Sequence, residues 1–192
     1  MRHIARQGRR HIFSRYLSGF TLPELVTTMA VVSIVTTTAI PGMQDMLQNN
    51  RMTTQVNTLV TSLHLARSEA VKRNQRITLC QSNDGISCGT SNDWHDGWII
   101  FSDANHDHGL DPEDTLIRVQ QKMNGNTTIK LTRSFGINHY MFYEPTGFTD
   151  TSGRFTFCDK TERTKKRGII YYRTGRPRFS YKGTSGKPLE CS

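Results

Sequence analysis

The chain has 192 residues, which is enough for one compact domain and one long additional element. Its formal net charge of +9 is unevenly distributed, because residues 1–19 hold five arginines and no acidic residue, residues 20–150 carry a net charge of −4, and residues 151–192 carry +8. This distribution favours a partner that presents phosphate groups or a membrane surface.

The N-terminal segment combines a basic leader with an apolar stretch. Residues 1–19 end in Ser18-Gly19, and the next 21 residues, Phe20 to Ile40, are apolar or threonine-rich with one charge, Glu24. About 20 such residues span a bilayer as a helix, and the arginines before them orient the leader toward the cytoplasm. In a secretory signal the apolar run precedes the cleavage site, whereas here Gly19 precedes the run. We therefore expect the anchor to remain in the mature protein.

This order of features resembles the precursors of type IV pilins and type II secretion pseudopilins. The residues that carry the resemblance are Gly19, Phe20, Thr21, Leu22, Glu24, Leu25 and Pro41. It implies that a prepilin peptidase removes residues 1–19 and methylates Phe20. It also implies that Glu24 pairs with a free α-amino group in an assembled fibre; the alternative is a Glu24 solvated at the membrane interface. Pro23 departs from the aliphatic residue usual there, but proline is tolerated in a first helical turn.

A second, amphipathic helical segment follows Pro41-Gly42, which should kink or loosen the helix. Its apolar residues recur at spacings of three and four up to about Arg73, and they are Met52, Val56, Leu59, Val60, Leu63, Ala66 and Ala70. The residues expected on its other faces are Arg51, Gln55, Ser62 and Glu69.

Short strand-like runs separated by turn residues make up the rest of the chain. They are residues 76–81, 98–102, 116–120, 127–132, 140–143, 154–158, 168–173 and 178–181. The predicted fold is α+β and pilin-like, with a long N-terminal helix packed on an antiparallel β-sheet domain. Residues 20–41 form the transmembrane or fibre-core half of the helix. Residues 42–192 form the globular domain, with the amphipathic half at about 42–73 and a basic tail at about 173–192.

Within this class the globular part resembles the FimT/GspH family of minor pilins and pseudopilins. Three segments carry the closer resemblance: His64–Ala70, then Gly97–Phe101 with Asp103-Ala104-Asn105, and Gly175-Arg176-Pro177-Arg178. In FimT-type minor pilins of naturally competent bacteria, a Gly-Arg-x-Arg motif in the C-terminal tail binds DNA. The resemblance therefore implies a DNA-binding role for this last segment.

The four cysteines, Cys80, Cys88, Cys158 and Cys191, allow three connectivities and lack the CxxC spacing of zinc and redox sites. Cys80 and Cys88 would close a small loop, and Cys158 and Cys191 would tie the C-terminus to a strand. Two disulfides with this pairing imply export to an oxidising compartment, and four free thiols are the alternative.

Other candidate sites are weaker. Residues 103–114 have oxygen ligands at alternate positions, as a calcium loop does, but His108 stands where the loop needs glycine. We expect a solvated acidic hairpin there and no metal site; His106 and His108 lack a third ligand. No phosphate-cradling loop, nucleophile elbow or credible histidine–nucleophile pair is present, so we expect neither enzymatic activity nor a cofactor.

The C-terminal basic segment is the strongest candidate site. Arginine forks match phosphate oxygens, and exposed aromatic rings can stack on bases. Gly175 shapes a turn or extended tail that presents Arg176 and Arg178, and a solvated hairpin without a ligand is the alternative. The supporting basic residues are Lys165, Lys166, Arg167, Arg173, Lys182 and Lys187, and the interleaved aromatic residues are Tyr171, Tyr172, Phe179 and Tyr181.

The sequence thus predicts a minor type IV pilin that binds the DNA phosphate backbone and aids DNA uptake in natural transformation. Its expected partners are DNA, other pilin subunits, the prepilin peptidase and the inner membrane. We expect a single-pass inner-membrane precursor with a periplasmic C-terminal domain, and later a subunit of a surface pilus. The alternative is a structural minor pilin or type II secretion pseudopilin that primes fibre assembly without binding DNA.

Overall fold

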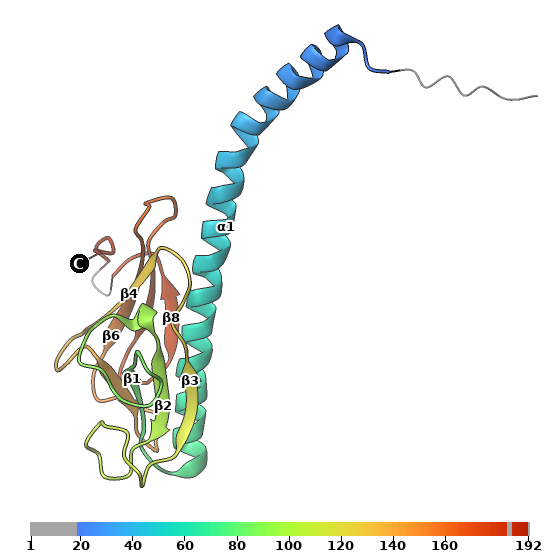
Figure 1. The fold of residues 1–192 in the computed structure, drawn as a ribbon. Coiled ribbons are helices and arrows are strands. Elements are labelled where there is room, and N and C mark those ends of the chain that lie inside the picture. The colour runs from blue at the N-terminus through green and yellow to red at the C-terminus, as the bar shows by residue number, and fades with distance from the viewer. Residues whose placement is uncertain (1–18, 184–185, 192) are drawn as a thin grey trace, which may run out of the picture. The chain divides into compact units, whose positions relative to one another are not determined.

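The computed structural model describes residues 19–183 and 186–191 (Figure 1). The chain divides into two compact units, Met1–Gly42 and Met43–Ser192, which are described separately. A single helix, α1 (Leu22–Arg73), contributes to both and stays helical through Pro41. All buried hydrophobic residues lie between Met52 and Leu189, so the second unit contains the entire core of the described chain.

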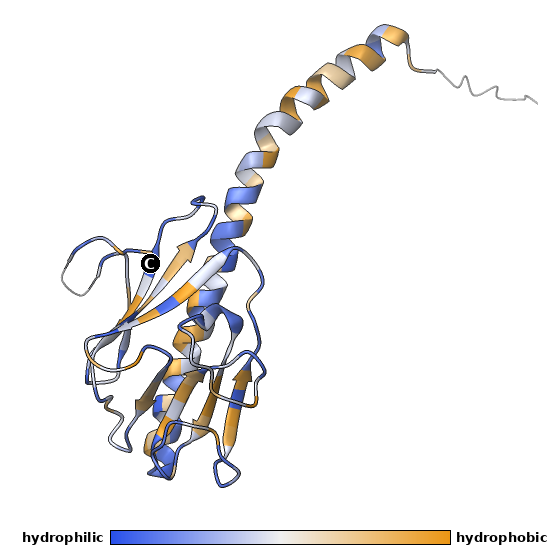
Figure 2. Ribbon diagram, turned by 60° about the vertical axis from the view of Figure 1, so that its left-hand side comes forward, coloured by the Kyte–Doolittle hydropathy of each residue, from blue (hydrophilic) through white to orange (hydrophobic). Residues whose placement is uncertain are grey.

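The first unit is the apolar start of α1. Its large hydrophobic side chains are exposed, and the colouring in Figure 2 shows that few of its residues are strongly hydrophilic. Six hydroxyl side chains donate to backbone carbonyls three or four residues earlier, and they are Thr27, Thr28, Ser33, Thr36, Thr37 and Thr38. A polar group inside lipid needs such an internal partner. The stretch is long and apolar enough to cross a membrane, and it fits a single-pass anchor.

In the second unit, the amphipathic half of α1 buries the predicted apolar stripe from Met52 to Ala70, with Val60 only partly buried. The expectation that Gln55 and Ser62 lie on other faces is wrong, because both are buried. Their positions fall within the width of the stripe, and Gln55 Nε2 donates to the carbonyl oxygen of Asn124 at 3.1 Å. Gln48 similarly donates to Asp159 at 3.1 Å. Polar residues of the helix therefore hold a loop and the end of a strand of the β-domain by hydrogen bonds.

The β-domain contains two four-stranded antiparallel sheets. The first has the order β3 (Leu116–Gln120), β2 (Trp98–Ser102), β1 (Ile77–Gln81), β5 (Tyr140–Tyr143). The second has the order β4 (Thr127–Arg133), β6 (Gly153–Asp159), β7 (Arg167–Tyr171), β8 (Pro177–Ser180). A short 3₁₀-helix, η1 (Trp94–Asp96), precedes β2. All eight predicted strands occur, each with ends within two residues of the prediction.

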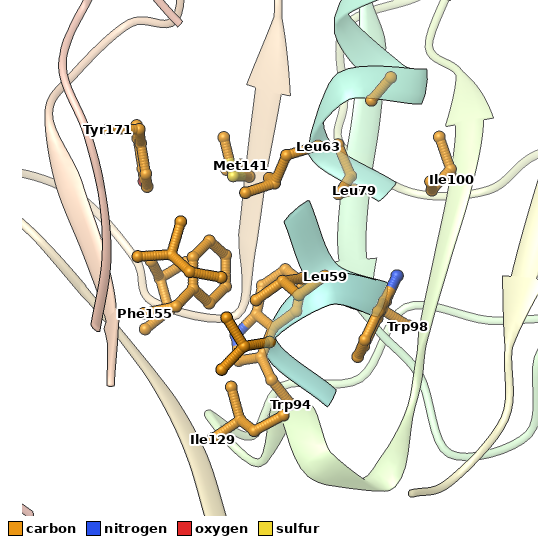
Figure 3. Close-up of a cluster of buried hydrophobic side chains, with 14 of the residues drawn as sticks. Leu59, Leu63, Leu79, Trp94, Trp98, Ile100, Ile129, Met141, Phe155 and Tyr171 are labelled. Atoms are coloured by element: carbon orange, nitrogen blue, oxygen red, sulfur yellow. The ribbon is translucent and has the colours of Figure 1, made fainter. Parts of the chain in front are cut away.

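One hydrophobic core joins α1 to the inner faces of both sheets (Figure 3). This core contains Leu59 and Leu63 of the helix together with Trp94, Trp98 and Phe155 of the β-domain. The Trp94 and Phe155 rings contact edge to face, with centroids 4.9 Å apart. Since large fully buried side chains of this kind each contribute roughly 1.5–3 kcal/mol, this core determines how the sheets are held on the helix.

The acidic loop joins the antiparallel strands β2 and β3 as a hairpin and is largely exposed, as expected, except at its first residue. Asp107 is exposed, but Asp103 is fully buried and accepts a hydrogen bond from Thr78 Oγ1 at 2.7 Å. The ring of His108 stacks on Tyr140 at a centroid distance of 4.3 Å, and its Nδ1 lies 3.3 Å from Asp103 Oδ2. Within residues 19–183 and 186–191, no group of three histidine, cysteine or acidic side chains is arranged to hold a metal ion.

The C-terminal segment folds back onto the second sheet and is not a free tail. Both disulfides of the favoured pairing form, Cys80–Cys88 and Cys158–Cys191. The second ties the chain end to β6, and Leu189, which is 3% exposed, lies against Gly168 of β7. The segment therefore covers part of the outer face of the second sheet.

The two disulfides should contribute unequally to stability. They span 33 and 8 residues, and the chain-entropy model gives about 3.7 kcal/mol for Cys158–Cys191 and about 2.5 kcal/mol for Cys80–Cys88. Chemical denaturation of the Met43–Ser192 segment should therefore show a larger loss for Cys158→Ser/Cys191→Ser than for Cys80→Ser/Cys88→Ser. The reverse order would mean that native contacts, and not loop closure, determine the contribution of each disulfide.

Candidate nucleic-acid interface

The predicted DNA-binding motif forms the turn and the second strand of a β-hairpin at the edge of the second sheet. Tyr171 of β7 pairs with Pro177 of β8, and Ile170 pairs with Arg178. Residues 172–176 connect the strands, and the N–H of Gly175 donates to the carbonyl oxygen of Tyr172 at 2.8 Å. The sequence allowed either a turn or an extended tail at Gly175, and the structure contains the turn.

Gly175 is required at this turn for two physical reasons. Its φ of +71° lies in the left-handed region, which L-residues with a Cβ rarely adopt. A Cβ on Gly175 would also fall on the carbonyl oxygen of Gly147 and lie 2.8 Å from Cε1 of Tyr143. The turn is therefore packed directly against the loop that follows β5.

That loop is itself fixed to the helix and to the turn. Nε of Arg67, on α1, donates to the carbonyl oxygen of Gly147 at 3.0 Å. The N–H of Thr149 donates to the carbonyl oxygen of Arg173 at 2.9 Å. A continuous series of contacts thus connects the helix to the hairpin turn, so the arginines of the motif extend from a supported backbone.

Arg173, Arg176 and Arg178 are exposed, and none of them belongs to an ion pair between described residues. The two carboxylates of the supporting loop are already paired. Glu144 accepts from Arg76 at 2.5 Å, and Asp150 accepts from Arg133. These neighbouring acids are therefore committed to other arginines, and the three guanidinium groups of the hairpin are available to an anion.

The predicted lysine cluster lies at the opposite end of the same hairpin. Lys165, Lys166 and Lys182 are exposed close to the Gly168–Ser180 pair, and Ser180 is four residues, or roughly 13 Å at about 3.3 Å per residue, from Arg176. Arg167 differs from its predicted role, because its Nη1 donates to Thr53 Oγ1 at 2.7 Å and its Nη2 to Asn49 on α1. We therefore count Arg167 as a helix contact and not as part of the interface.

The aromatic residues of the segment separate into two groups. Tyr171 belongs to the core and is fully buried, so the expectation that it stacks on bases is wrong. Burial raises the pKa of Tyr171 above its usual range, which keeps the side chain neutral. Tyr172, Phe179 and Tyr181 are 45%, 48% and 58% exposed and remain available.

Arg154 is an additional basic residue that the sequence analysis missed. It pairs with Ile170, which pairs with Arg178, so both arginines lie on the same face of the sheet, two strands or about 10 Å apart. Arg154 is partly exposed, and its Nε donates to Thr156 Oγ1 at 3.1 Å. Only the register of β6 on β7 brings it close to the motif, and the sequence does not specify that register.

The predicted processing and assembly residues lie at the start of the described chain. Gly19 and Phe20 precede α1, and Glu24 lies in its first turn. All three are exposed in the isolated subunit. Residues 1–18 of the predicted leader lie outside the described residues.

The family model of the type II transport protein GspH matches residues 55–175, more than half of the chain. Among solved structures, the type IV minor pilin FimU of Pseudomonas aeruginosa is similar, with a TM-score of 0.56 and 21% identity over 76% of this chain and 98% of that chain. The minor pseudopilin EpsH from the Type 2 Secretion System of Vibrio cholerae has a TM-score of 0.49 and 11% identity over 68% of this chain and 96% of that chain. No curated protein sequence matches significantly. The likeness to FimU confirms the pilin-like fold, and the GspH match ends just before Arg176.

Substitution of Gly175 should cost more than substitution of a glycine that has the same backbone conformation in open space. Gly186 provides this control, since its φ is +76° and nothing lies within 4 Å of the position of its Cβ. Gly186→Ala should cost about 1–2 kcal/mol through conformation alone. Gly175→Ala should cost a further ~1–3 kcal/mol through overpacking against Gly147 and Tyr143. Equal losses in denaturant unfolding would show that the turn is not packed against this loop.

Proposed function

The chain belongs to the family of the type II transport protein GspH, and on that premise we propose that it is a minor type IV pilin that binds DNA during natural transformation. The observation that carries the DNA-binding part is the supported turn with three exposed arginines, Arg173, Arg176 and Arg178, free of carboxylate partners among the described residues. The proposed role is one of binding and assembly.

Phosphate is the ligand that this geometry suits best. A guanidinium group is planar, always charged, and donates two parallel hydrogen bonds to a phosphate. Arg176 is the last residue of the turn and Arg178 lies two positions later on the edge strand β8, so they can reach successive points along a charged polymer. Lys182 and the Lys165-Lys166 pair extend the positive charge along the same hairpin. Contacts of this kind fix the position of a nucleic acid without reading its sequence.

The anchor and its leader complete the proposal. The prepilin peptidase would cleave after Gly19, leaving Phe20 as the methylated N-terminus of an apolar helix in the inner membrane. Glu24, in the first turn of this helix, would then pair with the α-amino group of a subunit in the fibre. The globular unit would be periplasmic before assembly and would lie on the pilus surface afterwards, where it can meet DNA.

A structural subunit without DNA binding is the second candidate, either as a minor pilin or as a type II secretion pseudopilin. The observation that favours it is that the GspH match ends at Gly175, before both arginines of the motif. In that case the basic hairpin would contact an acidic surface on a neighbouring subunit. DNA retention by the purified globular unit distinguishes the two candidates.

Replacement of Arg176 and Arg178 by glutamine should weaken DNA binding by the Met43–Ser192 segment. Non-specific binding of this type has a Kd of roughly 10⁻⁴–10⁻⁶ M at physiological salt, and each phosphate contact contributes about 0.9 to the slope of log K against log salt. The double variant should therefore lower the slope by about two, equally for unrelated duplex sequences. Fluorescence anisotropy across a salt series measures both quantities.

Arg51→Gln/Arg118→Gln is the matched control, because it removes two arginine charges elsewhere that, like those of the motif, belong to no ion pair between described residues. Arg51 lies sixteen residues before Arg67 on α1, or about 24 Å from the helix contact that supports the turn. This control should lower affinity only slightly and leave the slope unchanged. If the motif variant binds like the parent at every salt concentration, the hairpin is not the DNA site and the structural subunit becomes the better proposal.

Cleavage should occur between Gly19 and Phe20 in cells that contain a prepilin peptidase. The reason is the position of Gly19 between a basic leader and the apolar run that starts at Phe20. Intact-mass measurement of the membrane form should show the loss of residues 1–19 and one added methyl group. Gly19→Gln should preserve the leader and block fibre incorporation, and a processed Gly19→Gln variant would place the cleavage site elsewhere.

A further inference from the structure

A hollow with one aromatic wall and two lysines lies beside the end of β8. It is lined by Lys165, Lys166, Tyr181, Pro188 and Leu189, with a volume of about 570 Å³. Tyr181 is exposed over 58% of its surface, whereas Leu189 is almost fully buried. The wall is therefore apolar where it meets the sheet, and its ring is open to a ligand.

The backbone that forms this hollow is fixed by several contacts. Lys182 and Pro188 form an isolated β-bridge, and the N–H of Gly183 donates to the carbonyl oxygen of Lys187 at 2.7 Å. The Cys158–Cys191 disulfide holds the chain two residues after Leu189. The ring of Phe179 contacts that of Tyr181 edge to face at 4.8 Å, which orients the tyrosine.

The charge around the hollow is positive. Lys165 and Lys166 also line a second hollow of about 710 Å³, together with Lys160, so the two lysines form a basic ridge between the hollows. Asp159 and Glu162 line this second hollow as well, but Asp159 accepts hydrogen bonds from the backbone N–H groups of Thr161, Arg163 and Thr164. No described acidic residue lines the hollow beside Tyr181.

We propose that the hollow beside Tyr181 receives an unpaired base of single-stranded DNA, which stacks on the tyrosine ring while adjacent phosphates contact Lys165 and Lys166. This inference rests on the proposed DNA-binding function and specifies the form of DNA. A base within a duplex has both faces covered by its neighbours, so only an unpaired base can offer a face to Tyr181. Arg176 and Arg178 would hold phosphates of either form.

One strand can reach both parts of this surface. Arg178 and Tyr181 are three residues apart, roughly 10 Å along the extended chain. Single-stranded DNA could therefore follow β8 from the arginines to the aromatic hollow. Stacking is tolerant of sequence because every base has a π-face, which agrees with the absence of sequence preference proposed above.

The test compares three probes of equal length on the Met43–Ser192 segment: oligothymidine, a blunt duplex, and an abasic strand that retains phosphates but lacks bases. Tyr181→Ala should weaken oligothymidine binding on the order of 10-fold, since stacking of this type has that magnitude per base. Binding of the duplex and of the abasic strand should be unchanged. Tyr181→Phe retains the ring and should bind all three probes as the parent does.

Phe135→Ala is the matched control, because Phe135 is 82% exposed on the β4–β5 loop and does not line the hollow. It should leave the three affinities unchanged. Lys165→Gln/Lys166→Gln should weaken the binding of all three probes, because all three contain phosphates. Thermal melting of each variant checks that the fold is intact.

Equal affinity of Tyr181→Ala and the parent for oligothymidine would overturn the stacking proposal. Equal weakening for all three probes would also overturn it, because Tyr181 would then act without a base. The proposed function fails separately, when Arg176→Gln/Arg178→Gln binds the duplex like the parent. A loss confined to oligothymidine in Tyr181→Ala, with tight binding retained by Tyr181→Phe, would support the inference.

Discussion

The apolar stripe of α1 from Met52 to Ala70 is the surface on which both sheets pack. Neither sheet forms a closed core alone, because the inner-face residues Leu79 and Phe155, one from each sheet, meet the same helix. Each sheet is antiparallel and buries its inner face against the common helix, an arrangement that an amphipathic helix with a wide apolar stripe can support. The positions of the loops that join the strands follow from this shared packing.

The candidate DNA site obtains its rigidity from the same helix through a short series of contacts. Arg67 fixes the carbonyl of Gly147, and that carbonyl lies where a side chain on residue 175 would be. Glycine is thus required at this position by the body of the protein and not by DNA. The arginines that follow it can be exposed and flexible at their ends because the backbone that carries them is held. A site built in this way loses little side-chain packing when its charged residues are exchanged.

Local patterns in the sequence predicted most of the fold. The 3.6-residue period gave the helix and its end at Arg73, and alternation between turn residues gave all eight strands. Features that depend on register or on burial of polar groups were not predictable. In the sequence, Tyr171 cannot be told apart from the other aromatic residues of the basic segment. In the structure, its pairing with Gly153 directs its side chain into the core. Arg167 and Asp103 were given the wrong environment for the same reason, because their partners, Asn49 and Thr78, come from other elements.

The net charge of residues 151–192 is +8. Whether this charge acts on a ligand depends on the nearest carboxylates and not on the negative net charge of residues 20–150 as a whole. At physiological ionic strength, charges separated by more than about 8 Å in solvent are largely screened, so the acids closest to the turn matter most. Glu144 and Asp150 in the loop beside the turn could neutralise its arginines, but Arg76 and Arg133 already bind them. Arg133 is almost fully buried, and a buried arginine without its carboxylate would be costly, so Asp150 is strongly held there. The core therefore removes the local acids from competition, and the positive potential of the hairpin remains available to phosphate.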